Sequence, residues 1–70
     1  MVHDRAIPVR NTGTKFAAFV TRFDNCALVQ IYRRPAPYEI DFSREVMEYE
    51  TARNGASEAA RRDIRKLEAE

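Results

Sequence analysis

The chain has 70 residues, one cysteine, one histidine and a net charge of +1. A core of this size supplies only about 3–5 kcal/mol unless a disulfide, a metal or a partner adds to it. The single Cys26 and the single His3 allow neither an internal disulfide nor a histidine cluster for zinc. We therefore expect one small folded domain that gains support from a partner or a second copy and holds no cofactor or metal.

Residues 1–13 are predicted to form an irregular arm that ends in the turn residues "NTG". The segment "AIPVR" is compatible with an edge strand, where proline is tolerated. The arm has no apolar run, so it predicts neither a signal peptide nor a membrane span. Together with a free thiol, this predicts a cytoplasmic protein without membrane contact.

A β-hairpin is predicted next, with strands over about Thr14–Phe23 and Cys26–Arg34. Asp24 and Asn25 suit a two-residue turn, because both tolerate a positive φ. If the loop has two residues, one side of the hairpin is aromatic and partly polar, with the pairs Phe23–Cys26, Thr21–Leu28, Phe19–Gln30 and Ala17–Tyr32. The other side is compact, with the pairs Arg22–Ala27, Val20–Val29, Ala18–Ile31 and Phe16–Arg33. A one-residue shift would exchange these sets.

The segment 38–42 alternates apolar and acidic residues, which predicts a third strand in a β-meander over 14–42. Ser43 is a suitable N-cap for a helix over 44–53, which Asn54 and Gly55 would end as a left-handed C-cap. A second helical stretch begins at Ala56. Gly55 either separates two helices or weakens one long helix, and we favour two. The predicted fold is a small α+β domain: an antiparallel hairpin or three-stranded meander, followed by a helical segment over 43–69 packed on one face.

The aromatic side of the hairpin is the first candidate for function. An uncovered face of this kind is rare in a soluble monomer that does not use it for a partner. The alternative is that the arm folds over it through Ile7 and Val9, and we favour the interface. The apolar contacts expected at this interface are Phe19, Phe23, Leu28 and Tyr32.

Basic residues on the hairpin are the second candidate. Lys15 lies opposite Arg34 in the predicted register, an unfavourable pair unless an acid lies between them. Three acidic groups could lie there: nucleic-acid phosphate, a partner's carboxylates or the chain's own C-terminal half. The last is compatible with the charge distribution, since residues 1–36 carry +4 and residues 37–70 carry −3. We expect Arg22, Arg33 and Arg34 to attract an acidic partner.

Catalytic groupings are missing from the sequence. His3 lies near the N-terminus, and no activating base is evident for Cys26. The segment "GTK" at 13–15 lacks the earlier glycine and the following helix of a phosphate-binding loop. The protein is therefore not expected to be an enzyme.

The segment "YEIDFSREVMEYETARNGASEAARRDIRKLE" (38–68) resembles a ribbon-helix-helix protein, a family of bacterial antitoxins and plasmid repressors. "NGASEAARRDIRKLE" is similar to the second helix of that family. The resemblance implies a strand, two helices and a DNA-binding dimer. Here the strand would point Glu39 and Asp41 toward DNA phosphates, which opposes binding. From this resemblance we therefore expect a local pair of helices in the chain, not operator recognition.

These features together predict a small non-catalytic protein-binding module. Phage, plasmid and other mobile-element accessory proteins that inhibit or regulate by occupying a partner's surface are of this kind. A homodimer through the free sheet face is compatible with it. The alternative is a nucleic-acid-binding transcriptional regulator that uses the basic hairpin or a ribbon-helix-helix dimer.

Overall fold

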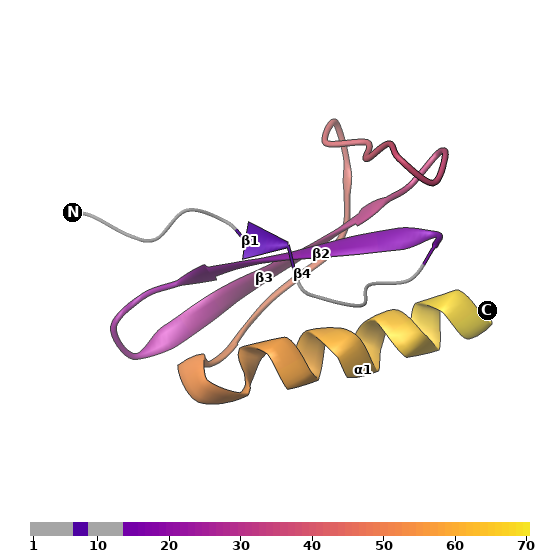
Figure 1. Cartoon of the computed structure of the whole chain (residues 1–70). Coiled ribbons are helices and arrows are strands. Elements are labelled where there is room, and N and C mark those ends of the chain that lie inside the picture. Colours follow the sequence, from indigo (N-terminus) through magenta and orange to yellow (C-terminus); the bar gives the residue numbers. More distant parts are fainter. Residues whose placement is uncertain (1–6, 9–13) are drawn as a thin grey trace.

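The computed structural model describes residues 7–8 and 14–70, which form one antiparallel sheet and one α-helix. The elements are β1 (Ile7–Pro8), β2 (Phe16–Arg22), β3 (Cys26–Arg33), β4 (Glu45–Ala52), a 3-10 turn η1 (Arg53–Gly55) and α1 (Ala56–Ala69). The strand order is β1-β2-β3-β4, so each strand pairs with the one before it. α1 lies along one face of the sheet, and the loop between β3 and β4 rises from the other face (Figure 1). The α+β class is confirmed.

The β2–β3 hairpin has the predicted register. Val20 lies opposite Val29 and Phe19 lies opposite Gln30. The Phe23 N–H donates to the Cys26 carbonyl at 2.9 Å and closes the turn over Asp24 and Asn25. Two turn residues therefore decide which side chains of both strands face α1, because side chains alternate between the two faces of a strand.

The core lies between the sheet and α1. Its buried residues are Phe16, Ala18, Val20, Ala27, Val29, Ile31, Ala56, Ala60 and Ile64, with Met47, Tyr49 and Leu67 partly buried around them. Four of these nine buried residues are alanines, present in both layers. Small side chains let the helix approach the sheet closely, and the larger Val20, Val29 and Ile31 fill the remaining space. The compact side of the hairpin is thus the side that α1 covers.

The strand predicted over 38–42 is wrong: residues 34–44 form a loop. Tyr38 is 99% exposed and Phe42 is 63% exposed, so their alternation with acidic residues does not mark a buried face. The loop is held by its own turns, with the Glu39 N–H donating to the Ala36 carbonyl at 3.0 Å. Two prolines, Pro35 and Pro37, favour such turns because they cannot donate to a strand ladder.

The helix predicted over 44–53 is also wrong, because this segment is the strand β4. Its half-buried residues Met47, Tyr49 and Thr51 alternate with exposed glutamates, which is the period of a strand. Pairing with β4 satisfies the backbone groups along the open edge of β3 and those on the facing edge of β4. Ser43 is accordingly not an N-cap; its N–H donates to the Asp41 carboxylate at 3.0 Å within the loop.

One helix, α1, follows η1, so the favoured pair of helices is not observed. Gly55 has φ −102°, outside the left-handed region, and precedes α1 instead of ending an earlier helix. At the other end of the sheet, Ile7 and Pro8 pair with Val20 and Phe19 as the short edge strand β1, as "AIPVR" suggested. The rest of the predicted arm, including His3 and Val9, lies outside the described residues.

Candidate functional site

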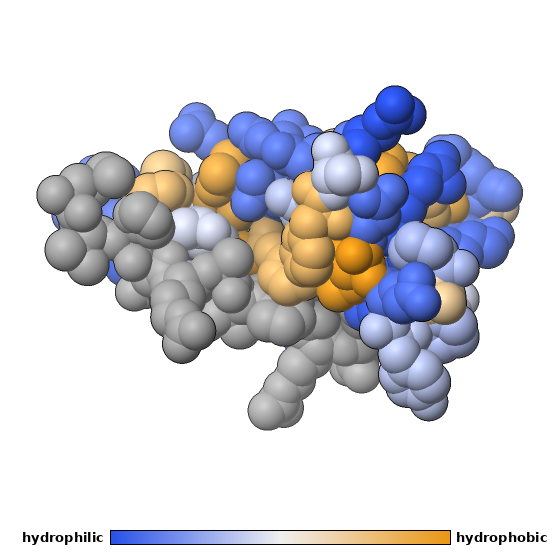
Figure 2. Space-filling view, turned by 90° about the horizontal axis from the view of Figure 1, so that it is seen from above, coloured by the Kyte–Doolittle hydropathy of each residue, from blue (hydrophilic) through white to orange (hydrophobic). Residues whose placement is uncertain are grey.

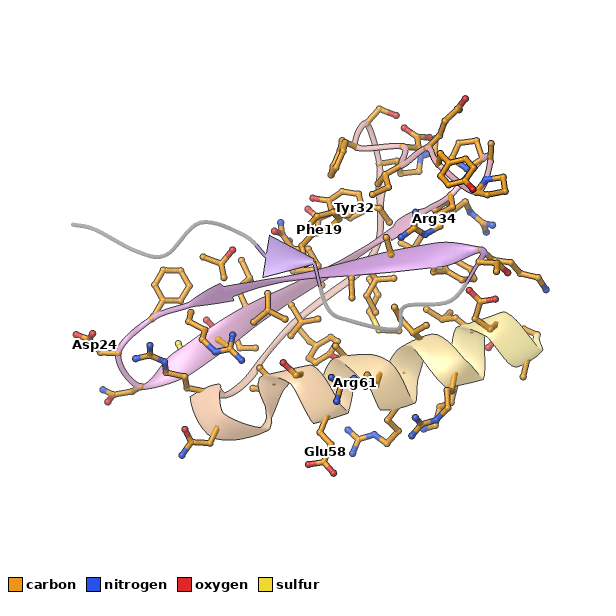
Figure 3. The ribbon with its side chains drawn as sticks, in the orientation of Figure 1. Phe19, Asp24, Tyr32, Arg34, Glu58 and Arg61 are labelled. Atoms are coloured by element: carbon orange, nitrogen blue, oxygen red, sulfur yellow. The ribbon has the colours of Figure 1, made fainter. Side chains whose placement is uncertain are left out.

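The face of the sheet opposite α1, called here the outer face, carries the aromatic side of the hairpin. From β2 and β3 it presents Ala17, Phe19, Thr21, Leu28, Gln30 and Tyr32, and from β4 Glu45, Glu48 and Glu50. Phe19 and Tyr32 lie side by side above the strands (Figure 3), with ring centroids 5.9 Å apart. The structure therefore brings together two of the predicted partner contacts.

Phe42, from the loop, packs on both rings. Its centroid lies 5.4 Å from Phe19 and 5.2 Å from Tyr32, and the rings are tilted or edge-to-face, the arrangements that aromatic pairs prefer. The chain's own loop therefore covers part of Phe19. Most of the Phe42 side chain still faces solvent.

Arg34 anchors the base of this loop. Its Nε donates to the Phe16 carbonyl at 3.3 Å, and its Nη1 donates to the Pro37 carbonyl at 3.4 Å. Its backbone N–H donates to the Lys15 carbonyl at 2.8 Å. Figure 3 shows Arg34 below the loop, beside the start of β2. The predicted partner contact Arg34 is thus engaged within the chain.

Arg22 and Arg33 point to the side of α1, away from the aromatic rings. Nη2 of Arg22 donates to Oγ of Ser57 at 3.3 Å, and Cζ of Arg33 lies 5.4 Å from the centroid of Phe16. Both residues belong to the same alternation as Val20, so the register itself places them there. These two arginines and the aromatic residues therefore lie on opposite faces of the sheet.

One acidic group expected beside the basic hairpin comes from α1 of the same chain. Oε2 of Glu68 accepts the backbone N–H groups of Lys15 at 2.7 Å and Phe16 at 3.1 Å. Nζ of Lys15 donates to the Glu68 carbonyl at 3.3 Å. The basic and acidic halves thus contact each other within the monomer at this point.

The remaining predicted contacts lie on the outer face without joining the aromatic group. Leu28 is half-buried between Thr21 and Glu50 of the neighbouring strands. Phe23 follows the end of β2 beside the turn and is also half-buried.

Sequence reasoning missed Tyr38 and Phe42 as surface aromatics. Together with Val46 they are the large apolar side chains most exposed in the part of the chain that the structure describes. Figure 2, which views the molecule from above the loop, shows orange apolar side chains gathered beside blue hydrophilic ones. The flanking prolines of Tyr38 were the available signal, since they favour a loop over a strand.

The β4 half of the outer face is acidic. The β3–β4 pairing shifts between Ile31 and Tyr32, so Glu45 lies opposite Tyr32 and Glu48 opposite Gln30. This irregularity brings two glutamates three residues apart to the same side. A side-chain hydrogen bond with Glu48, burial and repulsion by Glu48 raise the pKa of Glu45, while Nε2 of Gln30 donates to Glu45 at 3.4 Å. Burial, then Glu45 and Glu48, raise the pKa of Tyr32.

The exposed side of α1 is basic. At helical spacing it carries Arg61, Arg62, Arg65 and Lys66. Two acidic residues lie near them: Glu58, which points away from the sheet (Figure 3), and Asp63, whose Oδ1 lies 3.7 Å from Nε of Arg62. The exposed side of α1 thus carries more cations than carboxylates, whereas the outer face of β4 carries carboxylates.

The described part of the chain contains no cluster of potential metal ligands. Over residues 14–70, three His, Cys, Asp or Glu side chains nowhere gather as metal ligands would. Cys26 has a free, half-buried thiol beside the hairpin turn. Within the same residues, no helix has the length and apolar content to cross a membrane.

No protein-family model, curated protein or solved structure matches this chain.

Proposed function

We propose that this protein is a non-catalytic binding module that occupies the surface of a partner protein through its loop and outer face. The observation that carries the proposal is that one loop exposes two aromatic side chains, Tyr38 at 99% and Phe42 at 63%. Exposed aromatic side chains contribute little to folding, whereas aromatic anchors dominate the binding energy of protein interfaces. An accessory inhibitor or regulator of a phage or plasmid acts in this way.

The loop is suited to binding because it is already ordered. Phe42 rests on Phe19 and Tyr32, and Arg34 fixes the base of the loop. A binding surface held in place before contact loses less conformational entropy when the partner arrives. Tyr38 then supplies an aromatic side chain that a partner pocket can bury in full.

The charge around the loop favours a basic partner surface. Glu39 is exposed beside Tyr38, and Glu45 and Glu48 share the outer face with the aromatic group. Arg22, Arg33 and Arg34, which we expected to attract an acidic partner, also contact Ser57, Phe16 and Pro37 within the chain. Arg44 adds one exposed cation to the loop, but the exposed carboxylates outnumber it, so the excess charge is negative. An excess of one sign raises the association rate with a partner of the opposite sign.

A photo-crosslinking amino acid at Tyr38 tests the proposal, because a fully exposed position tolerates the replacement. The same group at Arg65 on α1 is the matched control. The protein captured from Tyr38 is then purified, and its affinity is measured by calorimetry for wild type, Tyr38→Ala, Phe42→Ala and Lys66→Ala.

We expect Tyr38→Ala and Phe42→Ala each to weaken binding about tenfold or more. Lys66→Ala, on the opposite layer, leaves the affinity unchanged. If the captured protein binds Tyr38→Ala and Phe42→Ala as tightly as wild type, the loop is not its binding site and the proposal fails.

A second candidate function, nucleic-acid binding, is favoured by one observation: the cations on the exposed side of α1. Arg62 and Arg65 are exposed there, and phosphate contacts of this kind give affinity that falls steeply with salt. A mobility-shift series against salt with Arg62→Glu plus Arg65→Glu tests it. No shift at low salt rules this function out.

A further inference from the structure

β4 is an edge strand whose far side is open. It is the last strand in the order β1-β2-β3-β4, and β3 is its neighbour on the other side. Alternate backbone N–H and C=O groups of its eight residues therefore point away from the sheet, with no strand to meet them among residues 7–8 and 14–70. Such an edge is a template for pairing with another chain.

A hollow lies at the Ala52 end of this edge, on the side of α1. The helix lies over β2 and β3 more than over β4, so Met47 and Tyr49 remain half-buried. The hollow has a volume of ≈ 400 Å³ and is lined by Thr51 of β4 and, from η1 and α1, by Gly55, Glu58, Ala59, Arg62 and Arg65. The small residues Gly55 and Ala59 leave room for one inward side chain of an added strand beside Thr51.

The charges on β4 select what can pair there. Glu48 and Glu50 stand exposed on the outer face of the strand. A second copy pairing through its own β4 would place glutamates beside glutamates, and like charges on adjacent strands are destabilising. Lysine or arginine at the facing positions turns each of these pairs into an attraction.

We propose that β4 takes up an extended segment of another protein as a further antiparallel strand, with lysine or arginine at alternate positions beside Glu48 and Glu50. The backbone supplies the hydrogen bonds of strand addition, and the inward residue beside Thr51 enters the hollow next to Ala59. The two proposals share Glu48, but the function proposed above does not use the backbone edge of β4, so each can fail without the other.

The test uses an eight-residue peptide in which lysine alternates with valine, added to the full chain and followed by two-dimensional NMR. A second peptide has glutamate in place of lysine, and a third is the lysine peptide N-methylated at alternate residues on its pairing edge. We expect the lysine peptide to shift the backbone amides of β4 and to slow their hydrogen exchange. The glutamate and N-methylated peptides should bind at least about tenfold more weakly, because each loses one of the two interactions.

The double variant Glu48→Lys plus Glu50→Lys should reverse the preference between the two peptides and bind the glutamate peptide more tightly. Glu39→Lys plus Glu70→Lys is the control, since it changes the net charge by the same amount at exposed positions outside β4. If the N-methylated peptide binds as well as the lysine peptide, or if the control loses binding equally, then simple charge attraction explains the effect and strand addition is wrong. An absence of shifts in β4 also overturns the proposal.

Discussion

The two faces of the sheet use the same strands but hold their side chains differently. On the side of α1, Val29 and Ile31 are fully buried among aliphatic neighbours. On the outer face, Leu28 and Tyr32 from the same strand are only half-buried, and the loop covers part of Tyr32. The first face therefore supplies most of the folding energy, and the second leaves apolar surface exposed. Four experiments separate these roles.

The largest effect is expected in the core. Ile31→Ala removes a fully buried side chain and leaves a cavity, which costs about 2–5 kcal/mol. A domain of this size has only about 3–5 kcal/mol to lose. We expect the variant to be largely unfolded at 25 °C, as measured by circular dichroism with urea. A cooperative transition with the wild-type midpoint would show that the core is not between the sheet and α1.

On the outer face the same kind of deletion should cost less. Phe42→Ala removes the ring contacts with Phe19 and Tyr32, each worth about 0.5–1.5 kcal/mol in well-packed pairs. Because most of Phe42 is exposed, we expect a loss of about 1 kcal/mol in urea denaturation. Tyr38→Ala, which touches no core residue, should change stability by less than about 0.5 kcal/mol. Equal losses for both variants would contradict the described loop.

Tyr49 offers a further test of the core face, because it carries a polar group on the core side of β4. Its hydroxyl is buried, and no hydrogen bond of ordinary geometry satisfies it within the described residues. Burial, then the nearby Asp63, raise the pKa of Tyr49 to about 12. A folded-state pKa above the unfolded value of about 10 stabilises the protein below pH 10. That contribution is lost as the pH rises from about 10 to about 12.

Tyr49→Phe removes both effects. We expect the variant to be as stable as wild type or up to about 1 kcal/mol more stable at pH 8, because an unsatisfied hydroxyl is gone. It should also lose less stability between pH 8 and pH 11.5. Urea denaturation at the two pH values measures both quantities. A destabilised variant with the wild-type pH dependence would mean that the hydroxyl has a partner in solution.

The smallest effect on stability belongs to the acidic part of the outer face. Since Glu48 raises the pKa of Glu45, Glu48→Gln should return that pKa toward its ordinary value. A raised carboxyl pKa favours the folded state below the unfolded pKa, and this advantage is lost as the pH rises through the folded value. NMR titration of the Glu45 carboxyl carbon measures the change. An unaltered pKa would place the two side chains apart in solution.

Local signals were sufficient for the hairpin. Asp24 and Asn25 fixed a two-residue turn, and alternation then assigned Val20 to the core and Phe19 to the outer face. The same register placed Arg22 and Arg33 on the side of α1, so their separation from the aromatic residues was predictable. The start of the second predicted helix at Ala56 was likewise readable, because good helix formers and an apolar stripe follow it.

The segment 38–52 could not be assigned from its own residues. Tyr38, Ile40 and Phe42 alternate like a strand, and "REVMEYETAR" contains residues compatible with either a helix or a strand. Propensity differences between these states are small, so the surroundings decide. β3 had an unpaired edge, and pairing with Glu45–Ala52 satisfied its backbone groups and extended the core through Met47.

The candidate site depends on that same decision. Once β4 pairs with β3, the ends of the two strands must be joined over residues 34–44, and this loop carries Phe42 onto Phe19 and leaves Tyr38 in solvent. The sequence by itself determined the hairpin, its two unlike faces and the C-terminal helix, because those features arise between near neighbours. Only the tertiary structure decided what covers the outer face and which edge remains open, because both follow from pairing between distant segments.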